Sequence, residues 1–474
     1  MSSETFILMR HELLLTAAAL LVLMAEIFTD PRKGRAGISI FSVIVYALIT
    51  IAGFIPSGEG SLFGGMYVTD GTRLIMKNIL NIGVLLVLIQ SIDWLRKEEN
   101  AARISEYIIL IISTIIGMNF MISAGHFIMF YIGLELATIP ITALAAFERY
   151  KNKSAEAGIK LIFTSALSSG ILLYGLSMFY GTTGTLYFSE MATAFRGENL
   201  QILGFIFFFA GMAFKISLVP FHLWAADVYE GAPINVTSYL SVVSKGAAVF
   251  ILIIILFTVF PVIIGVWQKT IYVIAVLTMT IGNLFAIRQQ NFKRFLAFSS
   301  ISQAGYILLG LISGNELGMA TVIYYILVYV FSNLGAFGVV TAISNATGKE
   351  SMADYNGLYH TNPKLSLALT LALFSLAGIP PVAGFFGKFF LFAAAAHEGF
   401  YILVLIAVLN TIIALYYYLL PVKAMFMNKN ETPIVNFSST FSTKLALGLC
   451  LAGIVVTGLA STLFEMIRNL SFGV

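Results

Sequence analysis

A small set of charged residues lies inside stretches of the sequence that are otherwise apolar. These residues are Glu135, Lys160, Lys215, Lys245 and Lys388. A charge at the centre of a lipid bilayer costs roughly 2.5–3.5 kcal/mol on the insertion scale, and such charges commonly mark ion or proton pathways. A lysine held out of water beside a carboxylate can take up and release a proton. The set therefore predicts a path for protons or small cations.

Four of these residues lie deep in their apolar stretches. Glu135 is about ten residues from either end of its stretch, too deep to snorkel, so the alternative is a protonated carboxyl in a helix contact. Lys245 lies in mid-stretch among small residues. Lys215 lies one turn before Pro220, where a helix must break and leave carbonyls free, and Glu135 is its natural counter-ion. Lys388 follows a second proline-containing break.

Other polar residues in these stretches carry weaker signals. Lys160 opens its stretch a few residues beyond a loop, so a snorkelling side chain is an equal alternative to a functional one. Lys77 and Glu26 lie near the ends of their stretches and are predicted to be snorkelling anchors. His222 comes shortly after Pro220, and its position fits a proton relay as well as a structural role.

The sequence offers no sign of other chemistry. Its single cysteine, Cys450, cannot form an iron–sulfur site, and its 5 histidines show no metal-ligand spacing. We find no P-loop and no dinucleotide fingerprint. We therefore expect no cofactor and no metal in this chain, and a driving force that comes from an ion gradient or a partner. A Na⁺ site would need several carboxylates around one point, and only Glu135 is expected to be deep.

The elements that position these residues are predicted to be transmembrane helices. The chain has 474 residues, of which 59% are hydrophobic and 11% charged, whereas soluble domains average about 25% charged. Windows of about 20 apolar residues give about fourteen spans. They begin near Glu12, Gly37, Leu74, Ile104, Gly125, Ala157, Leu200, Ile234, Thr270, Phe295, Gly318, Leu365, Tyr401 and Leu445. We expect an all-α polytopic membrane protein whose first span is retained and is not a signal peptide.

The distribution of basic residues predicts the orientation of the chain. Most lysines and arginines outside the spans lie on alternate loops, for example at Arg32, Arg96, Arg149, Arg288 and Lys429. The positive-inside rule places these loops in the cytoplasm and both termini on the outer, periplasmic side.

The spans also show a weak internal repeat. The starts near Ile104 and Ile234 recur near Thr270 and Tyr401, and proline breaks fall in the seventh and twelfth spans. Because a repeat of five helices is odd, the second copy must be inverted in the membrane, a common plan in transporters. We predict one membrane domain over 1–474, made of three N-terminal helices (1–103), a first repeat (104–258), an inverted second repeat (270–427) and a C-terminal helix (444–466).

Several long motifs are similar to those of a known family. Residues 156–181, 221–245, 291–311 and 378–388 are the most specific stretches. The chain resembles the antiporter-like membrane subunits of bacterial type I NADH:quinone oxidoreductase (respiratory complex I), and among them the subunit N family. Lys388 stands where the sister subunit M usually carries glutamate. The chain also ends soon after its last span, whereas subunit L continues into a lateral helix.

The resemblance implies a role for each buried charge. Glu135 and Lys215 would form a modulating pair, Lys245 would be the central proton carrier, and Lys388 would lie toward the outer half-channel. Lys160 and His222 match family positions along the connecting path.

The resemblance also implies a setting. The subunit would act in a proton-translocating oxidoreductase of the bacterial inner membrane and would hold no redox site. NADH, FMN, iron–sulfur clusters and quinone would bind to partner subunits. Its own partners would be other membrane subunits, including sister antiporter-like subunits, and the lipid bilayer, but no nucleic acid.

Three residues depart from the family pattern. Ala226 and Asn235 stand where proline is frequent, which predicts a different loop shape, and Gln303 replaces a common histidine. Glutamine does not titrate, although it can hold water. The alternatives are an Mrp-type or stand-alone cation/proton antiporter and, against the number of deep charges, a structural subunit that braces an assembly.

Overall fold

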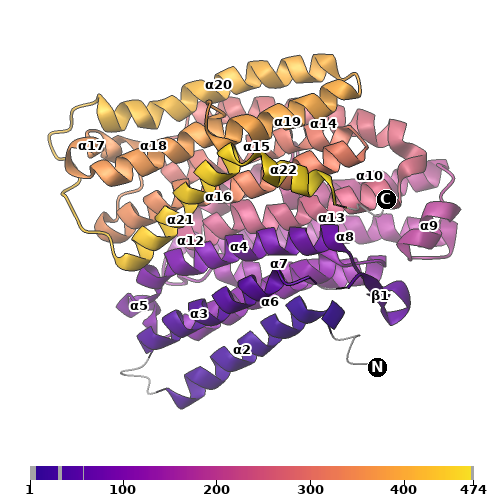
Figure 1. The fold of residues 1–474 in the computed structure, drawn as a ribbon, viewed down its shortest axis with the longest axis horizontal. Helices are drawn as coiled ribbons and strands as arrows, with labels where there is room; N and C mark the ends of the chain where they lie inside the picture. The colour runs from indigo at the N-terminus through magenta and orange to yellow at the C-terminus, as the bar shows by residue number, and fades with distance from the viewer. Residues whose placement is uncertain (1–6, 30–34, 57, 471–474) are drawn as a thin grey trace. The chain divides into compact units, whose positions relative to one another are not determined.

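A computed structural model describes residues 7–29, 35–56 and 58–470 of the chain. Helices make up most of this part, as Figure 1 shows. A short antiparallel hairpin joins β1 (Gly60–Leu62) to β2 (Tyr67–Thr69), with Gly60 opposite Thr69. The described chain is thus an all-α protein with one small hairpin between its second and third long helices.

The helices have the following bounds. They are α2 (Arg10–Phe28), α3 (Arg35–Gly53), α4 (Gly71–Leu95), α5 (Glu98–Ala101), α6 (Ile104–Ile122), α7 (Phe127–Ala145), α8 (Asn152–Thr183), α9 (Phe188–Ala194), α10 (Asn199–Ile216), α11 (Leu223–Gly231), α12 (Ile234–Tyr239), α13 (Lys245–Thr258), α14 (Ile264–Ile287), α15 (Phe292–Ile312), α16 (Glu316–Thr347), α17 (Leu358–Thr361), α18 (Pro363–Ala377), α19 (Ala383–His397), α20 (Tyr401–Phe426), α21 (Phe441–Leu459) and α22 (Ser461–Arg468). A π turn, Leu240–Ser244, joins α12 to α13.

The predicted spans coincide with these helices, but their count is not confirmed. In the described chain, 12 helices are long and apolar enough to cross a membrane. The apolar part of α3, Gly37–Gly53, is shorter, as are α18 and α19. The predicted twelfth span corresponds to the pair α18 and α19, because its proline-containing break divides it.

The chain folds as two compact units. The first contains α2 to α10 and α13, and the second contains α11, α12 and most of the chain from α14 to α22. In the second unit α15 is buried along its whole 18-residue apolar window. Polar side chains on α15 are therefore held inside the protein.

Small residues bring helices close together in the first unit. Gly117 on α6 faces Gly133 on α7, and a Cβ at Gly133 would lie 2.7 Å from the carbonyl oxygen of Gly117. Gly175 on α8 and Gly204 on α10 are packed in the same way. Lipid supplies no hydrophobic drive for helix association, so close backbone contact of this kind stabilises the packing. This close packing holds α7, α8 and α10 in place, the helices that carry Glu135, Lys160 and Lys215.

Both predicted helix breaks are present. α10 ends at Ile216 and α11 begins at Leu223, while α18 ends at Ala377 and α19 begins at Ala383. Proline has no backbone N–H and cannot continue a helix ladder, which explains both interruptions. After α10 the chain passes through Ser217, whose φ of 62° lies in the left-handed region that is costly for a residue other than glycine.

The order of helices along the chain agrees with the predicted repeat, but it does not test where each copy begins and ends. The long helices α8 and α16 each have 32 residues, and each ends at a glycine with a left-handed φ, Gly184 and Gly348. After each of them comes a short helix, α9 or α17, and then a helix that ends at a break, α10 or α18. The inverted arrangement and its boundaries remain predictions.

Candidate functional site

Glu135 lies in the middle of α7. The helix begins after His126, whose Nδ1 accepts a hydrogen bond from the backbone N–H of Ile128 at 3.0 Å. The Glu135 carboxylate accepts a hydrogen bond from Ser169 of α8. The residue is half-buried, so its carboxylate is held by α8 while part of it faces the outside of this chain.

Lys215 lies in the last turn of α10, where a positive charge is favoured by the helix dipole. Its ammonium donates a hydrogen bond to Oγ1 of Thr138 at 2.6 Å. Thr138 is one turn after Glu135 on α7, so the Lys215 ammonium contacts the helix that carries this carboxylate. The structure therefore brings these two predicted residues together, with Thr138 as the direct contact.

Lys245 is the first residue of α13 and is only 6% exposed. It follows the π turn at Leu240–Ser244, a widened turn of a kind often found at functional sites. The neighbouring residues Gly246, Ala247 and Ala248 are small, as expected for a lysine enclosed by close packing. Lys245 is therefore enclosed by protein, while its depth in the membrane stays a prediction.

Lys160 occupies a different environment. It lies in the third turn of α8, and its ammonium pairs with Glu156 one turn earlier at 2.7 Å. Its side chain is 41% exposed in this chain. A glutamate four residues before a lysine is the favourable order for such a pair. These contacts are those of a partly exposed helix-surface lysine.

Lys388 is held at the second break, inside the second unit. Its ammonium donates hydrogen bonds to the carbonyl oxygens of Leu376 and Ala377, each at 3.0 Å, and the side chain is 3% exposed. These two carbonyls belong to the last turn of α18, which the break leaves without helical partners. The ammonium also lies over the ring of Tyr306, 4.5 Å from its centroid.

Gln303 shares an acceptor with Lys388. Its amide nitrogen donates to the carbonyl of Leu376 at 2.9 Å and to the hydroxyl of Tyr418 at 3.0 Å, and its amide oxygen accepts from Tyr325. Both amide hydrogens and one lone pair of the amide oxygen are thus used, three of the four hydrogen-bonding directions of this side chain. The Tyr418 hydroxyl contacts Ser299 in turn, at 2.5 Å.

These tyrosines were not among the site residues predicted from the sequence. The available signal was the clustering of tyrosines within apolar helices, at positions 324–329 and 416–418. Buried tyrosine hydroxyls need partners, so such clusters predict polar networks.

His222 is buried, 7% exposed, and lies directly before α11. Its backbone carbonyl accepts from the N–H of Ala225 at 3.0 Å and so starts the helix. It belongs to the same unit as Lys388. Ala226, a departure from the family pattern, lies inside α11 and is buried.

The prediction for Lys77 was wrong. Its side chain is 0% exposed, and its ammonium pairs with Glu12 of α2 at 2.6 Å and donates to the hydroxyl of Tyr67 at 2.9 Å. His11 lies beside this group, with Nε2 3.0 Å from Oδ1 of Asn78. Lys77 does not snorkel because Glu12 and Tyr67 supply partners inside the protein.

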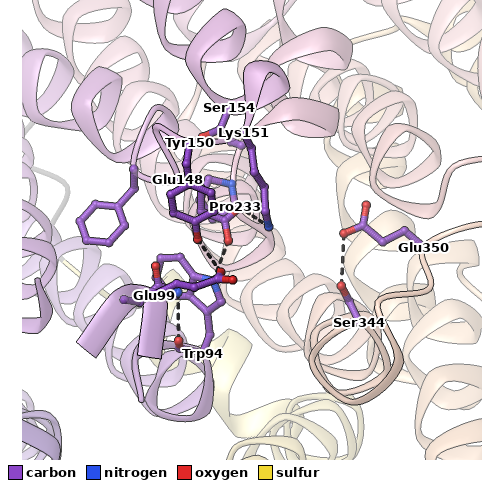
Figure 2. A network of polar contacts seen from close by, with 12 residues as sticks. Trp94, Glu99, Glu148, Tyr150, Lys151, Ser154, Pro233, Ser344 and Glu350 are labelled. Carbon is purple, nitrogen blue, oxygen red and sulfur yellow. Dashed lines mark hydrogen bonds and ion pairs between the residues drawn. The ribbon is translucent and has the colours of Figure 1, made fainter. Parts of the chain in front are cut away.

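A further carboxylate is buried at the loop between α7 and α8 (Figure 2). Glu148 is 7% exposed, accepts from Nε1 of Trp94 at 3.1 Å and pairs with Lys151 at 3.0 Å. In the same network Tyr150 donates to Glu99 at 2.8 Å, and burial, with that contact, raises the pKa of the Tyr150 phenol. Glu135 is therefore not the only enclosed carboxylate, since Glu12 and Glu148 are more buried.

These carboxylates do not form a metal site. Among the residues that the structure describes, no group of three or more His, Cys, Asp and Glu side chains is placed to hold a metal ion. The polar residues instead form hydrogen-bonded pairs and networks around individual lysines.

The sequence matches known proteins over nearly its whole length. The family model described as "NADH:quinone oxidoreductase/Mrp antiporter, TM" matches residues 124–414. A protein of Phocaeicola vulgatus named NADH-quinone oxidoreductase subunit N is 52% identical over 462 residues, which cover 97% of this chain and 98% of that protein. A protein of the same name from Moorella thermoacetica is 42% identical and covers 87% of each chain.

Solved structures share the fold. A chain of respiratory complex I from Thermus thermophilus is 27% identical, with a TM-score of 0.80 over 96% of this chain and 98% of that one. A chain of the Mrp complex from Dietzia sp. has a TM-score of 0.84 at 20% identity, over 99% and 97% of the two chains. The fold alone does not separate the oxidoreductase from the antiporter, whereas the sequence relatives do. This chain belongs to the subunit N family of NADH-quinone oxidoreductases, as an antiporter-like subunit of the membrane part of the complex.

Proposed function

We propose that this subunit carries protons across the membrane and that Lys215, Lys245 and Lys388 are the groups that do so. One observation supports this most directly. Each of the three lysines lies where the regular hydrogen bonding of a helix is interrupted: Lys215 before the first break, Lys245 after the π turn, and Lys388 at the second break. Irregular backbone at membrane depth occurs where it lines a cavity or an ion site.

In the first unit, Glu135 and Lys215 modulate the proton affinity of the path. Lys215 is held by Thr138, which lies one turn from Glu135 on α7. A shift of either group changes the electrostatic environment of α7 and α10. Lys245 is the central carrier, since it is a buried amine at the junction between the π turn and α13.

In the second unit, Lys388 is the terminal lysine of the path toward the outer half-channel. Its two carbonyl acceptors favour the charged form, while enclosure opposes it. Lys160 and His222 are proposed to lie along the connecting path, a role that rests on the family resemblance. The half-exposed ion pair of Lys160 makes it the weakest member of the set.

The free energy needed to move a proton across the membrane is modest. Moving one proton against 100 mV costs about 2.3 kcal/mol. One pKa unit corresponds to about 1.36 kcal/mol, so changes of a few units in proton affinity suffice to drive a proton forward. Such changes arise when a neighbouring charge approaches or leaves a group in a poorly polarisable site.

The chemistry that drives these changes is proposed to occur elsewhere in the complex. NADH, FMN, iron–sulfur clusters and quinone would bind to partner subunits, and this chain would hold no redox site. The subunit would lie in the bacterial inner membrane with both termini on the periplasmic side, as the positive-inside rule indicates.

The test is Lys245→Ala in the assembled complex. Proteoliposomes should show NADH oxidation with proton uptake per NADH abolished or severely reduced, because alanine cannot bind a proton. Lys429→Ala, a change of an exposed loop lysine, is the matched control and should leave uptake unchanged. Normal proton uptake by the assembled Lys245→Ala complex would sink the proposed role.

A further inference from the structure

The second unit contains a cavity whose lining includes none of the residues proposed for proton transfer. It has a volume of about 630 Å³ and lies between the first turns of α18 and α21 and the loop at 436–439. Its size is in the range of sites that hold small organic ligands. Every residue that lines it belongs to the described chain and to the second unit.

The mouth of the cavity is positively charged. Lys364 in the first turn of α18 and Lys444 in the first turn of α21 both line it, and the lining contains no Asp or Glu. Both lysines are exposed and so can reach a ligand. Hydroxyl and amide side chains, including Ser438 and Asn436, also line the cavity. This arrangement suits a singly or doubly charged phosphate group.

Another part of the cavity lining is apolar. Leu365 and Ala368 line it from α18, and Leu447, Gly448 and Leu451 line it from α21. These residues follow the lysines along their helices, so the cavity has a basic part and an apolar part. A free phosphate would leave this wall without a partner, whereas an acyl chain would cover it.

The cavity is built by the fold. Asn362, which is 5% exposed, accepts from the backbone N–H of Phe437 at 3.3 Å and donates to the carbonyl of Val435 at 3.3 Å. These bonds hold the loop in place as one wall. A Cβ added at Gly448 would meet no atom within 4 Å, so the space beside this glycine is open.

We propose that this cavity binds one anionic phospholipid, with its phosphate between Lys364 and Lys444 and an acyl chain along Leu365, Ala368, Leu447 and Gly448. Basic pockets between transmembrane helices at the membrane surface are known to bind such headgroups. The basic-residue pattern places both lysines on the cytoplasmic side, where they would meet the inner leaflet. This site is independent of the proton path.

The experiment uses the assembled complex in proteoliposomes that contain phosphatidylglycerol with a photoreactive diazirine in its acyl chain. After illumination, labelled peptides are mapped by mass spectrometry. We expect labels in α18 and α21 that are competed by unlabelled phosphatidylglycerol. Lys364→Gln with Lys444→Gln should lower this labelling at least about tenfold, because each lysine near the surface adds appreciable attraction to anionic lipid.

Gly448→Trp is the second variant, since it fills the open space without touching the lysines. It should also remove the label, whereas Gly181→Trp, another glycine with open space around it, should not. Competition by phosphatidylcholine equal to that by phosphatidylglycerol would show ordinary boundary lipid and overturn the proposal. Competition by inorganic phosphate would show a phosphate site instead. Unchanged labelling in both cavity variants would likewise refute it.

Discussion

At the scale of single residues, the acceptors of Lys388 explain why a glutamine can stand at position 303. Leu376 offers one carbonyl oxygen to two donors, the Lys388 ammonium and the Gln303 amide. Glutamine keeps donating whatever the charge of the lysine. A histidine has fewer hydrogen-bonding directions and could not contact Leu376, Tyr418 and Tyr325 at once. Gln303 is thus a fixed support for the lysine and its tyrosine neighbours.

This support can be tested with adjacent tyrosines of α16. Tyr325→Phe removes the donor to Gln303, and the loss of one buried partner costs about 1–3 kcal/mol. We expect lower NADH-driven proton uptake per NADH in proteoliposomes, because the amide loses its fixed orientation beside Lys388. Tyr324→Phe is the control, since that buried hydroxyl donates to the carbonyl of Thr457 instead. Equal uptake by the two variants would contradict a specific role for the Gln303 network.

The sequence did not predict which groups the buried lysines contact. Prolines predicted the break beside Lys388, but not which carbonyls its ammonium would find. Lys77 shows the same limit. Its position near the end of an apolar stretch indicated snorkelling, while its partner Glu12 lies 65 residues away in the chain. A pair that far apart depends on how helices pack, which periodicity does not record.

At the scale of elements, α7 depends on how it starts. His126 accepts the N–H of Ile128 with the lone pair of Nδ1, which protonation would remove. The residue lies just before the apolar span, and burial lowers its pKa from the ordinary 6.5. Because the folded state disfavours the charged form, this contribution to stability is complete above about pH 6.5 and is lost as the pH falls below it. The start of the helix that carries Glu135 is therefore acid-sensitive.

His126→Asn should remove this sensitivity. Asparagine can cap the helix but does not titrate, so the melting temperature of the purified complex should fall less between pH 7 and pH 5 than in the wild type. His126→Ala should be less stable by about 0.5–2 kcal/mol near neutral pH, where the cap is intact in the wild type. Parallel melting curves for wild type and His126→Asn over this pH range would refute the role of the histidine.

Element positions were largely predictable, and their lengths were not. The apolar stretches predicted the helices because twenty or so apolar residues can satisfy their backbone in lipid only as a helix. The count of fourteen spans was less secure, since α18 and α19 are each too short to qualify alone. The π turn before Lys245 left no mark in the sequence, because the same residues could equally form a regular helix.

At the scale of the whole molecule, the charge distribution predicts which loops face the cytoplasm. The single cysteine, Cys450, is buried, so introduced cysteines can be labelled against a low background. Spheroplasts treated with a membrane-impermeant maleimide should label Arg196→Cys at once and Lys429→Cys only after permeabilisation. Both positions are exposed in the structure. The reverse order of labelling would invert the proposed orientation of the path.

The divided helix also has a consequence for biogenesis. α18 and α19 have 15 residues each, and at about 1.5 Å per residue neither reaches across a hydrocarbon core of about 30 Å. The insertion machinery therefore has to accept residues 363–397 as one segment, with a polar kink at its centre. In the folded chain α15 packs against α19, and α16 packs against both α18 and α19. Because α15 and α16 precede this segment in the chain, they are made first and can cover the kink as the segment inserts.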